Sequence, residues 1–181
     1  MKKYHFNLIP FKKSLNSFDI QASLELVGSN LEIEFIVKGN IKNLHLPKSL
    51  DETKRVIGLW ESSCFECFIL NNETLSYYEF NYSPEGHWNC FYFPKPKAPL
   101  KQSPNFEEAT CVINLTDQTF SLKTTIDLYN FLPGFWKKEA MSFGLTSVIE
   151  CDEKLSYWAI SHIDEKPNFH NFESFERVVL E

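Results

Sequence analysis

Two parts of the sequence place carboxylates, an amide and large aromatic residues at spacings that a β-strand would turn to one face. The first part reads WESSCFECF over residues 60–68 and YYEFNYSPEGHW over residues 77–88. Residues two apart share a face of a strand, so Trp60 would lie on the same face as Glu66, and Glu79 on the same face as Asn81. A carboxylate in an aromatic strand needs a partner or a wet cleft, because burying an unpaired charge is costly. These residues predict a polar pocket with aromatic walls.

The second part reads LSYWAISH over residues 155–162 and KPNFH over residues 166–170. In a strand, Trp158, Ile160 and His162 would share one face. A mixture of acids, amides and aromatic rings suits a sugar, whose hydroxyls bond to polar groups while its C–H faces stack on rings. The alternative interpretation is that the tryptophans fill the core and the acids face solvent.

Glu66 and Glu79 also permit a catalytic interpretation. A glycoside hydrolase uses two carboxylates roughly 5–9.5 Å apart across a cleft, which neighbouring strands could supply. The sequence has neither a GxSxG motif nor the residue order of a hydrolase triad, so nothing supports acyl transfer. We expect a non-catalytic protein with no catalytic residue, and keep the hydrolase as an alternative.

The cysteines favour a reduced, cytoplasmic setting. The sequence has five cysteines, an odd number that cannot form a complete set of disulfides. Cys64 and Cys67 resemble a redox or zinc motif, but a strand would turn them to opposite faces, so we expect inert buried thiols. The sequence begins Met-Lys-Lys without an apolar signal segment after it, and no run approaches the ~18 apolar residues of a membrane span.

Strand-like runs recur along the chain, with turn residues such as Gly28-Ser29-Asn30 and Cys151-Asp152-Glu153 between them. The runs that predict strands are residues 4–9, 18–27, 31–37, 58–70, 76–82, 88–93, 111–115, 119–126, 142–150, 154–162 and 175–180. Residues 41–56 and the proline-rich residues 94–105 are expected to be loops, and residues 127–132 a short helix.

The composition agrees with a sheet protein. The chain of 181 residues has 17 Phe, 7 Tyr and 4 Trp, which suit a pleated, half-buried surface. Its net charge of −6 argues against nucleic-acid binding, which needs a basic surface. The sequence therefore predicts one all-β domain over residues 1–181, an antiparallel β-sandwich of about ten to twelve strands, of immunoglobulin-like or jelly-roll type.

The strings WESSCFECF, YYEFNYSPEGHW, LSYWAISH and KPNFH, in this order, resemble DOMON-like proteins related to family 9 carbohydrate-binding modules. The resemblance is concentrated in residues 58–93 and 141–175. It implies an immunoglobulin-like sandwich with a carbohydrate or sugar-like ligand held on one sheet and its neighbouring loops. The ligand-binding residues it indicates are Trp60, Glu66, Glu79 and Asn81, with Trp158 as the second aromatic residue; Tyr78, Trp88, His162 and His170 from the matched segments complete the set.

The same resemblance raises haem as an alternative ligand, because some DOMON-like proteins bind haem through an axial His or Met. The candidate axial residues are His87, His162 and His170, and the sequence has only two methionines, Met1 and Met141. A lone histidine in a strand is more often a structural hydrogen-bonding residue, so we expect no cofactor. We also expect no metal, since there is no Asp-rich loop of the kind that binds calcium.

Overall fold

The computed structural model describes residues 2–12, 18–47, 52–132 and 141–179, which form an almost entirely antiparallel β structure. The strands are β1 (Lys3–Pro10), β2 (Phe18–Val27), β3 (Asn30–Gly39), β4 (Cys64–Asn71), β5 (Tyr77–Tyr82), β6 (Trp88–Phe93), β7 (Cys111–Leu115), β8 (Thr119–Asp127), β9 (Met141–Cys151), β10 (Lys154–Ala159) and β11 (Glu176–Arg177). The helical elements are η1 (Leu59–Glu61), α1 (Leu128–Phe131) and η2 (Phe172–Ser174). Within the described ranges, none of these short helices could cross a membrane.

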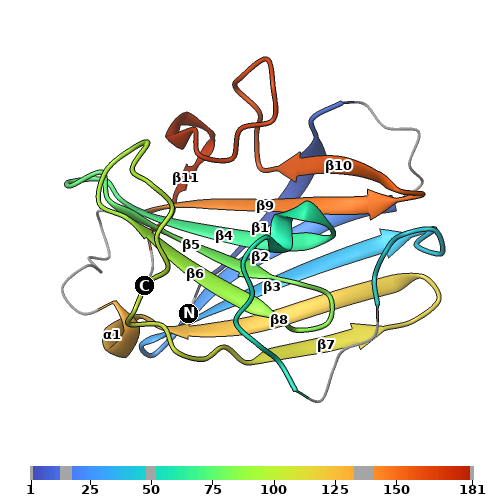
Figure 1. Ribbon diagram of the computed structural model, residues 1–181, viewed down its shortest axis with the longest axis horizontal. Helices are drawn as coiled ribbons and strands as arrows, with labels where there is room; N and C mark the ends of the chain where they lie inside the picture. Colours follow the sequence, from blue (N-terminus) through green and yellow to red (C-terminus); the bar gives the residue numbers. More distant parts are fainter. Residues whose placement is uncertain (1, 13–17, 48–51, 133–140, 180–181) are drawn as a thin grey trace.

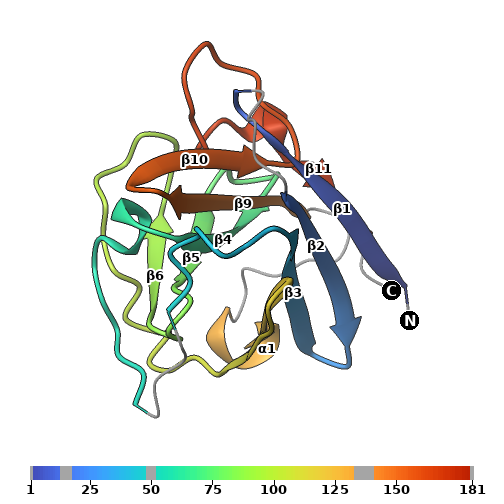
Figure 2. The same cartoon turned by 90° about the vertical axis from the view of Figure 1, so that its right-hand side faces the viewer.

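The strands form two layers that a shared strand joins (Figure 1). One layer has the order β1-β2-β3-β8-β7, and the other has the order β6-β5-β4-β9-β10, with β11 also paired to β9. Strand β1 belongs to both, because Leu8 pairs with Ile20 of β2 and the next residue, Ile9, pairs with Ala159 of β10. Figure 2 shows β1 running along the side of the sandwich towards β10. The expected β-sandwich is confirmed.

Tight turns set the strand pairing, as the sequence predicts. Strands β2 and β3 pair from Phe18 to the turn at Gly28, whose φ of +65° suits glycine. Strands β9 and β10 turn at Asp152 and Glu153, which both have positive φ and match the twist of the strands. The short helix is also confirmed: α1 follows Asp127, whose carboxylate accepts hydrogen bonds from the backbone N–H groups of the first turn.

The core lies between the two layers and combines aliphatic side chains with many aromatic rings. Phe65 of β4 stacks on Phe120 of β8, with ring centroids 5.2 Å apart and an interplanar angle of 10°. Phe35 of β3 packs on the same ring of Phe65 at 5.4 Å. These three rings are completely buried and join strands from both layers. Burial of such side chains is the main source of folding free energy.

Three predicted strands differ from the observed ones, and the strand expected over residues 154–162 ends at Ala159 as β10. The strand expected over residues 58–70 begins only at Cys64, because Gly58 has φ +84° and the chain then forms η1. The last strand, expected over residues 175–180, is limited to β11, and residue 180 lies outside the described residues. In the described parts of residues 41–56 and 94–105 there is no strand or helix, as expected for loops.

The outer face of the β4 layer is also covered, which is uncommon for an antiparallel sheet. All eight residues of β4 and all six of β5 are buried. The covering segment is the C-terminal chain, where Phe175 packs on Phe68 with ring centroids 5.5 Å apart. This contact requires glycine in β9, because a Cβ atom at Gly144 would lie only 2.5 Å from the ring of Phe175.

We therefore predict that Gly144→Ala destabilises the protein by about 1–3 kcal/mol, the usual effect of overpacking a dense site. Urea unfolding followed by tryptophan fluorescence would measure the loss. In a Phe175→Ala background the clash is gone, so Gly144→Ala should have little further effect there. Equal destabilisation in both backgrounds would contradict this explanation of Gly144.

Candidate ligand-binding pocket

A row of polar residues crosses the outer face of four adjacent strands. Thr146 of β9 pairs with Glu66 of β4, Glu66 with Asn81 of β5, and Asn81 with Asn89 of β6. All four residues are buried. Buried polar side chains need hydrogen-bond partners, so a polar row inside an aromatic layer indicates a special local role.

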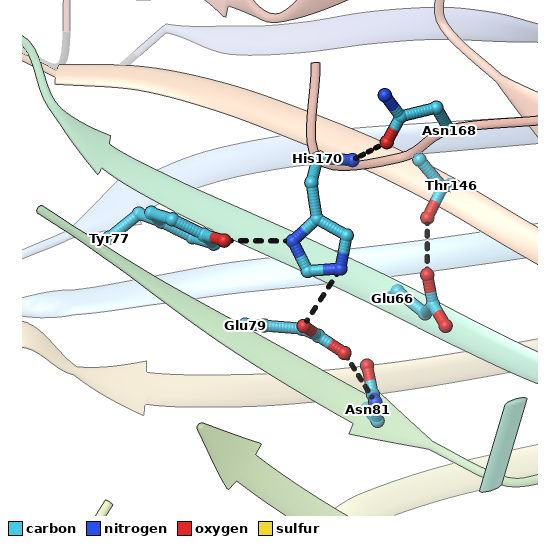
Figure 3. Close-up of polar contacts among 7 residues, drawn as sticks. All are labelled: Glu66, Tyr77, Glu79, Asn81, Thr146, Asn168 and His170. Carbon is cyan, nitrogen blue, oxygen red and sulfur yellow. Dashed lines mark hydrogen bonds and ion pairs between the residues drawn. The ribbon is translucent and has the colours of Figure 1, made fainter. Parts of the chain in front are cut away.

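Glu79 lies one row further along the same face and faces the same space as Glu66. It pairs with Phe68, two residues after Glu66, so the two carboxylates are diagonal neighbours on adjacent strands (Figure 3). Burial, and next the charge of Glu79, raise the pKa of Glu66 to about 8. Burial also raises the pKa of Glu79, to about 7. Near neutral pH the two carboxyl groups therefore retain protons that ordinary carboxyl groups would have lost.

The hydrogen bonds of the two carboxylates are incomplete. Oε2 of Glu66 accepts a hydrogen bond of 2.8 Å from the hydroxyl of Thr146. Oε1 of Glu79 accepts one of 2.8 Å from Nδ2 of Asn81. Oε2 of Glu79 and Oδ1 of Asn81 are buried and have no hydrogen-bond partner among the described residues. Such atoms carry a desolvation cost that a bound molecule could relieve.

His170 stands at the mouth of the site, between Tyr77 and Glu79 (Figure 3). Its Nδ1 is 2.8 Å from the hydroxyl of Tyr77, whereas its Nε2 is 3.6 Å from Oε2 of Glu79, too far for a hydrogen bond. Desolvation lowers the pKa of His170, so the ring is mainly neutral at pH 7. His170 therefore does not supply a counter-ion for the two carboxylates at that pH.

The loop that carries His170 is held by its own polar side chains. Oδ1 of Asn168 accepts a hydrogen bond of 3.1 Å from the backbone N–H of His170. Oδ2 of Asp164 accepts hydrogen bonds from Nδ2 of Asn168 at 2.8 Å and from Nδ2 of Asn171 at 3.0 Å. Figure 2 shows this segment, in orange-red, rising above β10. The bonds fix the loop as one wall of the site.

These groups surround a cavity of about 280 Å³. The residues that line it come from η1, β4, β5, β9, β10 and two loops: Trp60, Glu66, Phe68, Glu79, Leu100, Val148, Tyr157, Pro167, Asn168, Phe169 and His170. The carboxylates lie on the sheet, while Trp60 comes from η1, which packs on β4 and β5, and Tyr157 comes from β10, on the far side of β9. Trp60 is held edge-on against Phe91 at 5.8 Å, and Tyr157 against Phe169 at 6.2 Å. A carboxylate pair with aromatic rings around it can bind a small polar molecule that has apolar faces.

The structure brings together five of the nine candidate residues from the sequence. Trp60, Glu66, Glu79 and His170 line the cavity, and Asn81 is bonded to Glu79 beside it. The expectation that Glu79 and Asn81 share a face is confirmed, and so is the opposite orientation of their neighbours on β5.

Four candidates lie elsewhere. Tyr78, Trp88 and Trp158 point into the core between the layers, where Trp158 packs on Phe18 at 5.1 Å. His162 follows the end of β10 and contacts the backbone oxygen of Ile9 at 2.9 Å. None of the four lines the cavity.

The misplacement of Trp158 has a simple physical cause. Neighbouring residues of a strand face opposite sides, and β10 turns Trp158 to the core and therefore Tyr157 to the cavity. Tyr157 and Phe169 are the pocket residues that the sequence reasoning missed, although both lie inside the quoted motifs SYW and PNFH. Strand alternation alone does not say which face meets the core.

The residues behind the rival chemistries are also placed. Cys64 lies on the outer face and Cys67 in the core, and both thiols are buried and free, with pKa values raised by burial. Their expected opposite orientation is confirmed. Nδ1 of His87 accepts a hydrogen bond from the backbone N–H of Lys54, and Met141 lies in the core. In the described part of the chain, no cluster of three or more His, Cys, Asp or Glu could hold a metal ion.

Two solved structures resemble this chain along nearly its whole length. One is a protein from Bacteroides uniformis described as a "putative carbohydrate-binding protein", with a TM-score of 0.72 and 13% identity over 99% of this chain and 86% of that one. The other is a family 9 carbohydrate-binding module from Caldicellulosiruptor kristjanssonii in complex with glucose, with a TM-score of 0.65 and 11% identity over 97% and 83%. This chain shares their fold. No protein-family model matches the sequence, and no curated protein matches it.

The raised carboxyl pKa values predict how stability depends on pH. A group whose pKa is higher in the folded chain binds more protons there, so its contribution to stability is lost as pH rises through the folded pKa. As the pH rises from about 5 to about 8, we expect Glu66 and Glu79 to lower the free energy of unfolding. The loss is about 1 kcal/mol per pH unit for each carboxyl group that is protonated in the folded chain but ionised in the unfolded chain.

Urea unfolding at several pH values would measure this slope in the wild type and in the Glu66→Gln, Glu79→Gln double variant. The variant has no carboxyl groups in the pocket, so its stability should fall less over this range. Identical slopes in the two proteins would contradict the raised pKa values.

Proposed function

We propose that this chain is a non-catalytic domain that binds a small carbohydrate in the pocket formed by Trp60, Glu66, Glu79, Tyr157 and His170. The observation that carries the proposal is the pair of glutamate side chains, which are buried in the sheet and line one cavity together with the aromatic rings of Trp60, Tyr157 and Phe169. A protein of the same fold binds glucose, which supports this choice among small polar ligands.

The pocket suits the chemistry of a sugar ring. The hydroxyl groups of a sugar are hydrogen-bond donors, and Oε2 of Glu79 has no hydrogen-bond partner among the residues that the structure describes. The C–H faces of the ring are apolar and would contact Trp60 or Tyr157. The cavity of about 280 Å³ is slightly smaller than the roughly 300–1,000 Å³ typical of ligand sites, which favours one or two sugar rings over a long chain.

The wider assignments belong to the same proposal. The relation to DOMON-like proteins rests on the sequence motifs. A cytoplasmic location is supported by the cysteines. All five are free thiols, three of them are buried, and no two of them form a disulfide bond. Fractionation of cells that produce the native protein would test the location.

A hydrolase is the second candidate, because Glu66 and Glu79 share one cavity and both have a raised pKa. A raised pKa suits a general acid, but hydrolysis also needs an ionised partner, and here both groups are shifted in the same direction. Binding is therefore the better interpretation. Steady release of product from a panel of aryl glycosides, abolished by Glu66→Gln, would favour the hydrolase instead.

The binding proposal predicts that at least one monosaccharide or disaccharide binds to the purified protein. We expect Trp60→Ala and Glu79→Ala each to weaken that binding by about tenfold or more, since they remove a stacking surface and a charged acceptor. Isothermal titration calorimetry or ligand-observed NMR would measure the affinities.

His162→Ala is the matched control, because His162 lies outside the cavity although it belongs to the same motif region. It should leave the affinity within about twofold, which is near the precision of such comparisons. No binding across a broad panel, or equal losses in all three variants, would refute the proposed site.

A further inference from the structure

The pocket has two acidic groups that no positive side chain among its described lining residues balances. Two carboxylates, Glu66 and Glu79, face the cavity, and no Lys or Arg is among the described residues that line it. The Lys–Glu pairs of the described chain, Lys3–Glu34 and Lys123–Glu32, lie on the other layer. Ionising both groups in one buried site without compensation is costly, which is why they retain protons near neutral pH, and a cation that entered the site would stabilise their ionised forms.

The atoms that lack partners point to the same kind of ligand. Oε2 of Glu79 belongs to a side chain that is only 5% exposed, and it has no hydrogen-bond partner among the described residues. Oδ1 of Asn81, beside it, also lacks one. Oδ1 of Asn81 is an acceptor, and so is Oε2 of Glu79 in its ionised form, so the partner that suits both atoms is a donor. A protonated amine offers three N–H donors and a full positive charge, whereas a hydroxyl offers one donor and no charge.

The walls of the cavity favour the same charge. Trp60, Tyr157 and Phe169 border the space that the carboxylates face. The faces of aromatic rings attract cations, most strongly where water is excluded. Acidic groups on the sheet with aromatic rings around them are a combination that recognises ammonium groups.

We propose that the ligand of this pocket is an amino sugar whose protonated amine binds at Glu66 and Glu79. This inference rests on the proposed carbohydrate-binding function and narrows it to a substrate class. The pocket should distinguish a free hexosamine both from the neutral hexose of the same configuration and from the N-acetylated form, which keeps the nitrogen but loses the charge.

A cationic ligand also changes the protonation of the pocket. Near pH 6.5 the carboxyl groups of Glu66 and Glu79 retain protons, and a nearby ammonium group lowers their pKa values, so binding should release protons. The other titratable groups that face the pair are Tyr77, Cys64, Tyr157 and His170; burial raises the pKa of Tyr77 and Cys64, while desolvation lowers that of His170. The affinity for an amino sugar should therefore rise between about pH 5.5 and pH 7.

Calorimetry with matched sugars would test the inference. The panel pairs glucosamine, galactosamine and mannosamine with glucose, galactose and mannose and with the three N-acetyl derivatives, at pH 6.5 in two buffers of different ionisation enthalpy. We expect at least one amine to bind about tenfold more tightly than both of its partners, with proton release that its neutral partners do not show. In the Glu66→Gln, Glu79→Gln variant the ratio of amine to neutral affinity should fall close to one.

Each other result is informative. Neutral sugars that bind as tightly as the amines would overturn the amino-sugar inference and leave the carbohydrate-binding function intact. Equal affinities for the free amino sugars and for their N-acetyl derivatives would overturn it as well, because the positive charge of the amine would then have no role. Absence of binding by every sugar in the panel would refute the proposed function and this inference with it.

Discussion

The structure depends on a sheet that must be covered on both faces. Every residue of β4 and β5 is buried, so the alternation of side chains serves two interiors at once. One set of side chains, with Phe65 and Phe80, forms the core between the layers. The other set, with Phe68 and Tyr77, needs the C-terminal segment as a second cover. The pocket is the place where this second cover does not close over the sheet.

This position explains the electrostatics of the pocket. On a solvent-facing sheet Glu66 and Glu79 would be ordinary surface acids. Under a partial cover they lose much of their hydration, and the same loss of water favours the neutral form of His170, the basic side chain that lines the cavity with them. The polar site thus lowers the stability of the protein, and native structures retain such destabilising features mainly at functional sites.

Much of the fold could be predicted because it depends on local signals. Turn residues and alternating strands indicate hairpins such as β2–β3, and their number indicates a sandwich. The carboxylates could be found because acids within aromatic strands conflict with simple burial. The aromatic residues of the pocket are harder to predict. The alternation of a strand does not reveal which of its faces meets the core, so the sequence indicates Trp158 where the structure has Tyr157. The C-terminal segment that covers the sheet, which includes Phe169, is irregular, so it has no repeating sequence pattern that would predict its contacts.

The strand that joins the layers has a consequence for how the molecule is made. Strand β1 pairs with β10, and β4 lies between β5 and the much later β9, so residues near the start of the chain wait for partners near its end. Contacts between distant residues form slowly, because a long loop must close before they contribute any stability. During synthesis on the ribosome, hairpins such as β2–β3 can form early, whereas Tyr157 and His170 emerge only after the strands that carry Glu66 and Glu79. The pocket is therefore completed later than the sheet beneath it, and until then the aromatic face of that sheet is exposed to the chaperones and proteases of the cell.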